Sequence, residues 1–202
     1  MTKLTRALAL LTLAAAPAAP LAAQATGTPP PAPAGVGEPT AGFVSGPMMG
    51  DRAPDFSLPW ASVDGPGGAQ WWSLTGQRGK VVVLAFYPKD FTSGCTAEMQ
   101  TFRDQYSTMF GDGVEVVGIS ADSVETHVRF AQSLGLPFRL LSDPTQQVAK
   151  AWGSDGANGY NKRTVFVIDR RGKVTYTNRQ FGALDPKAYK DLQDAVTLAK
   201  KS

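Results

Sequence analysis

The sequence contains one cysteine and one histidine among its 202 residues. A single cysteine excludes an internal disulfide and a CxxC redox pair, and one residue of each type excludes a zinc site built from cysteine and histidine alone. We therefore predict no metal site and no cofactor. The charge is also small, with 20 Lys+Arg against 17 Asp+Glu and a net charge of +3. Without a dense basic stripe, nucleic acid is not the expected partner.

Residues 1–25 are typical of a secretory signal peptide. Lys3 and Arg6 precede an apolar run over Ala7–Ala16, and the small-x-small rule allows cleavage after Ala25 or Ala23. The alternative is a retained membrane anchor, but the run is shorter than the roughly 20 residues that span a bilayer. We expect export across the inner membrane, a periplasmic location and no stable membrane insertion after cleavage.

Residues 26–47 have the composition of a linker. They include five prolines between Pro29 and Pro39, and Glu38 is the only charged residue. Such a segment buries too little apolar surface to offset the entropy of ordering it, so we expect it to be extended or disordered. Residues 48–202 then form the folded domain.

The domain alternates strand and helix patterns. Apolar runs predict buried strands, and spacings of three and four residues predict helices between them. The expected strands are 81–87, 114–119, 138–141, 164–168 and 174–177, with small extra strands from 54–59 and 71–74. Helices are expected before Gly111, over 122–134, from Asp143-Pro144 to Trp152, and from Asp185-Pro186 onward. This order predicts an α/β fold with a mixed central sheet and helices on both faces.

Cys95 occupies the junction between the first strand and the first helix. Unpaired N–H groups and the helix dipole at that position favour a thiolate over a thiol. The alternative is an inert buried cysteine, but a loop-to-helix junction and an oxidising compartment both favour a functional thiol. Full ionisation raises reactivity by at most roughly thirtyfold, so other groups must bind the transition state.

The residues around Cys95 carry a specific resemblance. The run Tyr87-Pro88-Lys89-Asp90-Phe91-Thr92-Ser93-Gly94-Cys95-Thr96 contains P-x-x-x-T-x-x-C and resembles the peroxiredoxin signature. It is most similar to the peroxiredoxin Q, or bacterioferritin comigratory protein-like, group of the AhpC/TSA superfamily. The resemblance extends over most of residues 48–202, including Ala53–Phe56, Leu140–Pro144 and Arg163–Asp169. It implies a thioredoxin-like fold and reduction of hydroperoxides.

The resemblance also implies roles for individual residues. Cys95 would be the peroxidatic nucleophile, with the Thr92 hydroxyl near the sulfur and the peroxide. Arg163 would stabilise the thiolate and bind the peroxide oxygens, and Pro88 would shield the pocket from water. Glu98 would support the site. The ordinary alternatives are a strand terminator for Pro88, a helix cap for Thr92, and solvated charges for Arg163 and Glu98.

This sequence departs from the family at the residue that would resolve the oxidised Cys95. Many peroxiredoxin Q proteins have a resolving cysteine five residues after the nucleophile, and this chain has Gln100 there. An external thiol, from a thioredoxin-like protein or a small molecule, must then attack the sulfenic acid. Two copies could also join through Cys95. The resemblance favours a monomer or a homodimer.

Two other functions are compatible with the predicted fold. A copper-handling protein of the cell envelope needs a CxxxC pair and a distal histidine. Cys95 has no such partner, and His127 falls on the 122–134 helix, where a lone histidine is usually solvated or half-packed. The second alternative is a non-enzymatic protein that keeps the fold as an interaction surface, although all the expected site residues are present.

Overall fold

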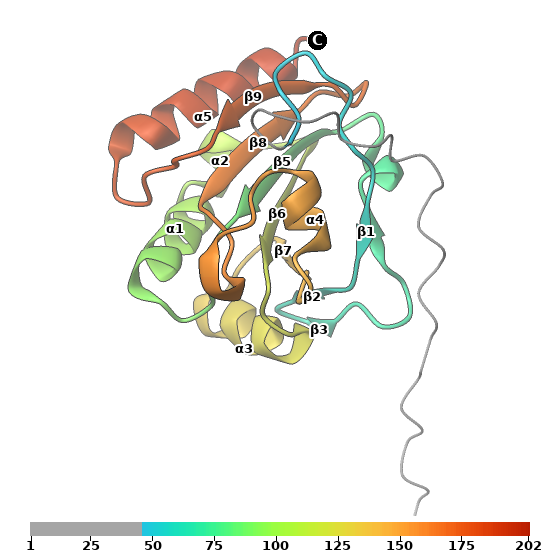
Figure 1. Ribbon diagram of the computed structural model, residues 1–202. Helices are drawn as coiled ribbons and strands as arrows, with labels where there is room; N and C mark the ends of the chain where they lie inside the picture. The colour runs from blue at the N-terminus through green and yellow to red at the C-terminus, as the bar shows by residue number, and fades with distance from the viewer. Residues whose placement is uncertain (1–45) are drawn as a thin grey trace, which may run out of the picture.

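The computed structural model describes residues 46–202 (Figure 1). The predicted signal peptide and residues 26–45 of the predicted linker lie outside this range, and both stay predictions. The described chain forms a seven-stranded mixed sheet, a two-stranded sheet and five α-helices. In residues 46–202, no helix combines the length and apolar character needed to cross a membrane.

The main sheet has the order β3-β2-β7-β6-β5-β8-β9. β5 pairs in parallel with β6, and β6 with β7, whereas the other neighbouring strands pair antiparallel. The strands of this sheet are β2 (Trp60–Ser62), β3 (Gly65–Pro66), β5 (Val81–Phe86), β6 (Val114–Ser120), β7 (Arg139–Ser142), β8 (Thr164–Ile168) and β9 (Val174–Asn178). The two-stranded sheet pairs β1 (Ser57–Leu58) with β4 (Trp72–Ser73), within the two segments where short strands were predicted.

Five helices surround the sheet. They are α1 (Ser93–Asp104), α2 (Tyr106–Met109), α3 (Val124–Leu134), α4 (Gln147–Ala151) and α5 (Pro186–Ala199). Helices α1, α2, α3 and α5 contribute buried side chains to one hydrophobic cluster, and α4 packs with β1 and β4 in a second cluster. Helices therefore cover both faces of a mixed sheet, and the predicted α/β architecture is confirmed.

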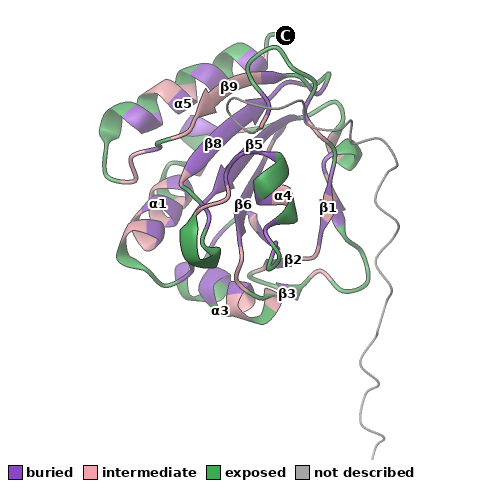
Figure 2. Ribbon diagram, viewed as in Figure 1, coloured by how far each residue is buried: buried purple, intermediate pink, exposed green. Residues whose placement is uncertain are grey.

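β5 lies inside the sheet between β6 and β8, and all six of its side chains are apolar and buried. Val81, Val83 and Ala85 belong to the first cluster, while the residues between them belong to the second. This alternation is the period of two expected for a strand that is covered on both faces. Figure 2 shows β5, β6 and β8 as largely buried. The loop that leads to Cys95 therefore starts from a well-packed strand.

Three predicted helix boundaries are wrong. α3 is capped by Ser123, whose Oγ accepts from the Thr126 amide at 3.3 Å, and not by Asp122. α4 begins at Gln147 and not at Pro144, because Gln146 has a left-handed φ of 53° that separates the turn from the helix. The helix expected before Gly111 is interrupted at Gln105, whose ψ of 14° is not helical, and continues as α2.

Candidate active site

Cys95 lies in the first turn of α1, where the chain leaves the central sheet. Residues 87–92 form the loop between β5 and α1. The first helical hydrogen bond joins the Thr96 amide to the Thr92 carbonyl at 2.8 Å, so the amides of residues 93–95 precede the helical bonding pattern. These N–H groups favour negative charge on the nearby sulfur. The cysteine is only 1% exposed.

Strand pairing places Arg163 opposite this sulfur. Thr164, the first residue of β8, pairs with Phe86, the last residue of β5. The residue before β8 therefore lies beside the loop that follows β5. Arg163 Nη2 donates to Cys95 Sγ at 3.3 Å, although the two residues are 68 positions apart in the sequence. A guanidinium at this distance stabilises an anionic sulfur and has further donors to offer a reactant.

Glu98, one helical turn after Cys95, forms an ion pair with the same guanidinium. Arg163 Nη1 donates to Glu98 Oε2, and the glutamate side chain is fully buried. Burial raises the pKa of Glu98 to about 7, although the positive charge of Arg163 acts in the opposite direction. Burial also disfavours the charged form of Arg163, but Glu98 and Cys95 together raise its pKa above the ordinary value. The guanidinium therefore stays charged beside the sulfur.

Thr92 and Pro88 shape the loop that precedes Cys95. Thr92 is the N-cap residue of α1, but its hydroxyl makes no side-chain cap and donates instead to the Lys89 carbonyl at 2.9 Å. This bond uses the hydroxyl proton, so the oxygen can still accept a hydrogen bond. Pro88 is half-buried and directly follows Tyr87. The structure thus brings Cys95, Arg163 and Glu98 into contact and places Thr92 and Pro88 in the adjoining loop.

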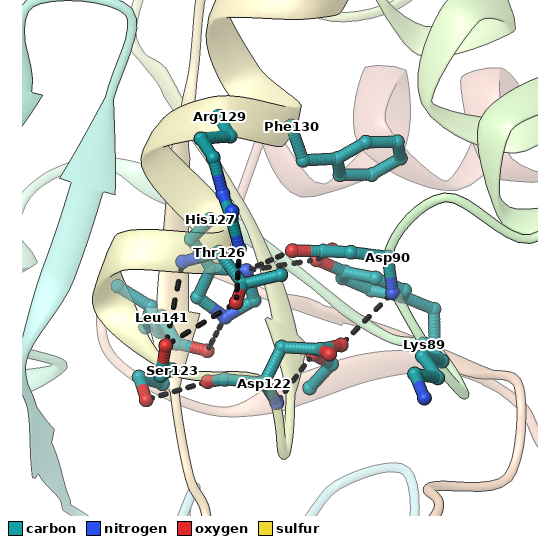
Figure 3. A network of polar contacts seen from close by, with 12 residues as sticks. Lys89, Asp90, Asp122, Ser123, Thr126, His127, Arg129, Phe130 and Leu141 are labelled. Carbon is teal, nitrogen blue, oxygen red and sulfur yellow. Dashed lines mark hydrogen bonds and ion pairs between the residues drawn. The ribbon is translucent and has the colours of Figure 1, made fainter.

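A buried polar cluster next to this loop was not predicted from the sequence (Figure 3). It consists of Tyr87, Asp90 and His127, and we call it the His127 cluster. The Tyr87 hydroxyl donates to Asp90 Oδ1 at 2.6 Å, and His127 Nδ1 lies 2.8 Å from Asp90 Oδ2. His127 is fully buried, so the interpretation of a solvated or half-packed histidine is wrong. The only sequence signal was an aspartate inside the Cys95 motif.

The arrangement around Cys95 can support nucleophilic chemistry at sulfur. It combines a buried thiol, a helix N-terminus and a charged fork of donors, which together stabilise a thiolate and the charge that develops on a leaving oxygen. In residues 46–202, no group of three or more His, Cys, Asp or Glu side chains is placed to hold a metal ion.

Comparison with known proteins identifies the family. The family model described as the AhpC/TSA family matches residues 49–177. The chain belongs to the AhpC/TSA family. Within this family, a chloroplastic peroxiredoxin Q of Triticum aestivum is 46% identical over 112 residues, which cover 54% of this chain and 52% of that protein. A putative peroxiredoxin bcp of Coxiella burnetii is 41% identical over 134 residues, which cover 63% of this chain and 85% of that protein.

Solved structures of AhpC/TSA family members have the same fold. The crystal structure of peroxidoxin BcpB from Mycobacterium tuberculosis has a TM-score of 0.64 and 31% identity, and the match covers 74% of this chain and 96% of that one. The bacterioferritin comigratory protein of Xanthomonas campestris has a TM-score of 0.61 and 26% identity, with 72% and 92% covered. The predicted peroxiredoxin Q resemblance and thioredoxin-like fold are confirmed, whereas the roles of individual residues stay predictions.

Proposed function

We propose that this chain is a thiol-dependent peroxidase that reduces hydrogen peroxide and organic hydroperoxides through Cys95. The contact of Arg163 Nη2 with Cys95 Sγ at the N-terminus of α1 carries the proposal. The related Xanthomonas campestris protein is described by its alkyl peroxide reduction activity. The wheat relative is matched over only 52% of its length, so the activity of this chain is inferred from its own site as well as from its family.

The first step transfers one oxygen atom to sulfur. The Cys95 thiolate attacks the terminal oxygen of the hydroperoxide ROOH, an S–O bond forms and the O–O bond breaks. The sulfur becomes a sulfenic acid, and the alkoxide leaves and takes up a proton to become an alcohol, or water in the case of hydrogen peroxide.

The residues around Cys95 act on the charge that moves during this step. Arg163 stabilises the thiolate and donates to the peroxide oxygens as negative charge reaches the leaving oxygen. Thr92 offers its hydroxyl oxygen as an acceptor for the peroxide proton. Pro88 limits water at the loop, and Glu98 fixes the orientation of the guanidinium through their ion pair.

Regeneration requires a thiol from outside the chain. The sequence has no second cysteine, and Gln100 stands where related proteins often have the resolving residue. An external thiol attacks the Cys95 sulfenic acid to give a mixed disulfide and water, and a second thiol then restores the Cys95 thiol and leaves as a disulfide. The reductant is a thioredoxin-like protein or a small thiol.

Copper handling is not supported by the position of His127. Its Nε2 atom lies 3.2 Å from the Leu141 carbonyl and its Nδ1 atom 2.8 Å from Asp90, so both ring nitrogens are engaged within the fold. Neither nitrogen is therefore available to join Cys95 in binding copper.

The proposed activity belongs to the cell envelope. The charged start and the short apolar run of residues 1–25 support export and cleavage after Ala25 or Ala23, leaving the domain in the periplasm without membrane insertion. We propose a monomer or a homodimer. Mass spectrometry of the mature N-terminus and sedimentation of the purified protein test these two points.

The decisive experiment measures peroxide consumption with dithiothreitol as reductant, for the wild type and for Cys95→Ser. The wild type should consume hydrogen peroxide and an alkyl hydroperoxide, and the variant should consume neither. Mass spectrometry of Cys95 after peroxide treatment should show the sulfenic acid and, with a small thiol added, the mixed disulfide. Equal consumption by both proteins would reject the proposed function.

A further inference from the structure

The loop before Cys95 is held in a conformation that its own residues do not favour. Phe91 has a φ of 59°, a left-handed value that is sterically unfavourable for a bulky residue. Its ring is 55% exposed and contacts Phe130 on α3 along one side. Such backbone strain persists only where the surrounding structure enforces it. The neighbouring residues must therefore fix this conformation.

Asp90 is the one residue of the 88–92 segment that is fully packed. Pro88 is half-buried and Lys89, Phe91 and Thr92 are exposed, whereas Asp90 is only 3% exposed. A carboxylate is costly to bury unless charge and hydrogen bonds compensate it. The contacts of Asp90 therefore determine where this segment lies.

Those contacts reach three parts of the fold (Figure 3). Asp90 Oδ1 accepts from the Tyr87 hydroxyl, and Oδ2 meets His127 Nδ1 on α3. Burial and the nearby Asp90 carboxylate raise the pKa of Tyr87 well above its ordinary value, so the hydroxyl stays a donor. The Asp90 amide donates to Asp122 Oδ2 at 2.8 Å, and that oxygen also accepts from Ser120 Oγ at the end of β6.

His127 is fixed in turn by the sheet. Its Nε2 atom lies 3.2 Å from the Leu141 carbonyl of β7. The Leu141 carbonyl and the Asp90 carboxylate both accept, so each ring nitrogen is placed to donate to one of them. The imidazole thus links Asp90 to β7 across the buried interface between α3 and the sheet. The hydrogen bonds of the described residues show no direct contact between this cluster and Cys95.

We propose that Asp90 and His127 are positioning residues that hold the 88–92 segment, and with it Thr92 and the first turn of α1, against Arg163. Tyr87 supports them through its hydroxyl. When the cluster is intact, Cys95 is covered and in contact with the guanidinium; when it is broken, the segment relaxes from its strained conformation and exposes the sulfur. The kinetic part of this inference rests on the proposed peroxidase function.

The test compares two reactions of Cys95 at one pH and at a temperature where every protein is folded. One is single-turnover oxidation by hydrogen peroxide, which needs the aligned site, and the other is alkylation by iodoacetamide, which needs an accessible sulfur. Asp90→Asn and His127→Gln should lower the oxidation rate constant at least tenfold and raise the alkylation rate constant severalfold. Tyr87→Phe should shift both rate constants in the same directions by a smaller factor.

A matched control separates positioning from general stability. Leu74 is buried in the hydrophobic cluster on the opposite face of the sheet, so Leu74→Ala should lower the melting temperature. Both rate constants of this variant should stay within twofold of the wild type. The proposal is overturned if the cluster variants also stay within twofold, or if Leu74→Ala changes both rate constants as they do.

The outcomes also distinguish this inference from the proposed function. A wild type that does not react rapidly with peroxide would reject the peroxidase, while the alkylation rates would still report whether the cluster covers Cys95. A reactive wild type with unaffected cluster variants would reject only the positioning role. If Asp90→Asn does not fold, Tyr87→Phe decides, because it keeps the ring and removes only the hydroxyl.

Discussion

Replacing Glu98 by glutamine should remove a pH dependence from the stability of the fold. The unfolded chain releases this proton near pH 4.5, whereas the buried carboxyl keeps it until about pH 7. Between these values the folded state holds a proton that the unfolded state has lost. The resulting stabilisation is complete below pH 4.5 and is lost as the pH rises through 7.

The size of the effect follows from the interval between the two pKa values. At about 1.4 kcal/mol per pH unit, the step from 4.5 to about 7 corresponds to about 3 kcal/mol of unfolding free energy. The ion pair with Arg163 is already included, because that charge lowers the pKa while burial raises it further. Glutamine cannot titrate, so the variant should lack this contribution at every pH.

Urea unfolding followed by tryptophan fluorescence measures the difference. Both proteins should carry Cys95→Ser, so that the thiol contributes nothing to the pH dependence. Between pH 5 and pH 7.5, the protein with Glu98 should lose about 2 to 3 kcal/mol relative to the protein with glutamine, without a change in the denaturant slope. All other titrating groups are shared and cancel in the comparison. If the unfolding free energies of the two proteins change with pH in parallel, the reasoning is refuted.

Substitutions at three further positions test the site directly, each read as the rate constant for oxidation of Cys95 by hydrogen peroxide. Arg163→Lys keeps the charge but loses the planar fork, and should lower the rate constant roughly a hundredfold; a change below threefold would contradict the role of the fork. Thr92→Val should lower the rate constant roughly tenfold or more, and Thr92→Ser should lower it much less. Equal effects of the two substitutions would exclude a role for the hydroxyl. Gly94→Ala adds a methyl group 3.3 Å from Arg163 Nη2, so it should slow oxidation several-fold. The thermal stability of this variant should be unchanged or higher, because alanine favours helix over glycine by about 1 kcal/mol.

Much of the sheet was predictable because its strands carry their own signal. Val81–Phe86 and Thr164–Ile168 are unbroken apolar runs, and a strand buried on both faces needs such a run. The two-stranded sheet of β1 and β4 was also expected. By contrast, β2 and β3 add to the main sheet with three and two residues, which are too few to show a periodic pattern. β3 pairs only with the neighbouring β2, and β2 joins the main sheet through β7, which is about 80 residues away in the sequence.

Helix starts were less predictable because they depend on contacts from other segments. Asp143 has the local features of an N-cap, and its Oδ2 does accept from the Ala149 amide in the first turn of α4, but the left-handed Gln146 means that the helix begins only at Gln147. Asp122 likewise has a suitable side chain, but this side chain instead accepts from the Asp90 amide. Local sequence shows which residues can cap a helix, and the tertiary structure decides which of them do so.

The residues of the candidate site were also predictable only in part. The motif pointed to Cys95, Thr92 and Pro88, and the family resemblance pointed to Arg163 and Glu98, which the structure places in direct contact with each other. His127 could not be placed, because a single histidine on a helix carries no sign of what it faces. Its partner Asp90 lies 37 positions away, and only the packing of α3 against the sheet brings them together.

The antiparallel register between β5 and β8 determines which changes in chain length the protein can absorb. Because Phe86 pairs with Thr164, the adjacent strands β5 and β8 set the distance between the Cys95 sulfur and the Arg163 guanidinium. The residues that connect the two strands do not set it. Insertions in surface turns between residues 104 and 162 leave that separation unchanged. Deleting a single residue inside β8 would turn Arg163 toward the other side of the sheet. Variation in length is therefore tolerated in the surface turns between these strands and excluded from β8.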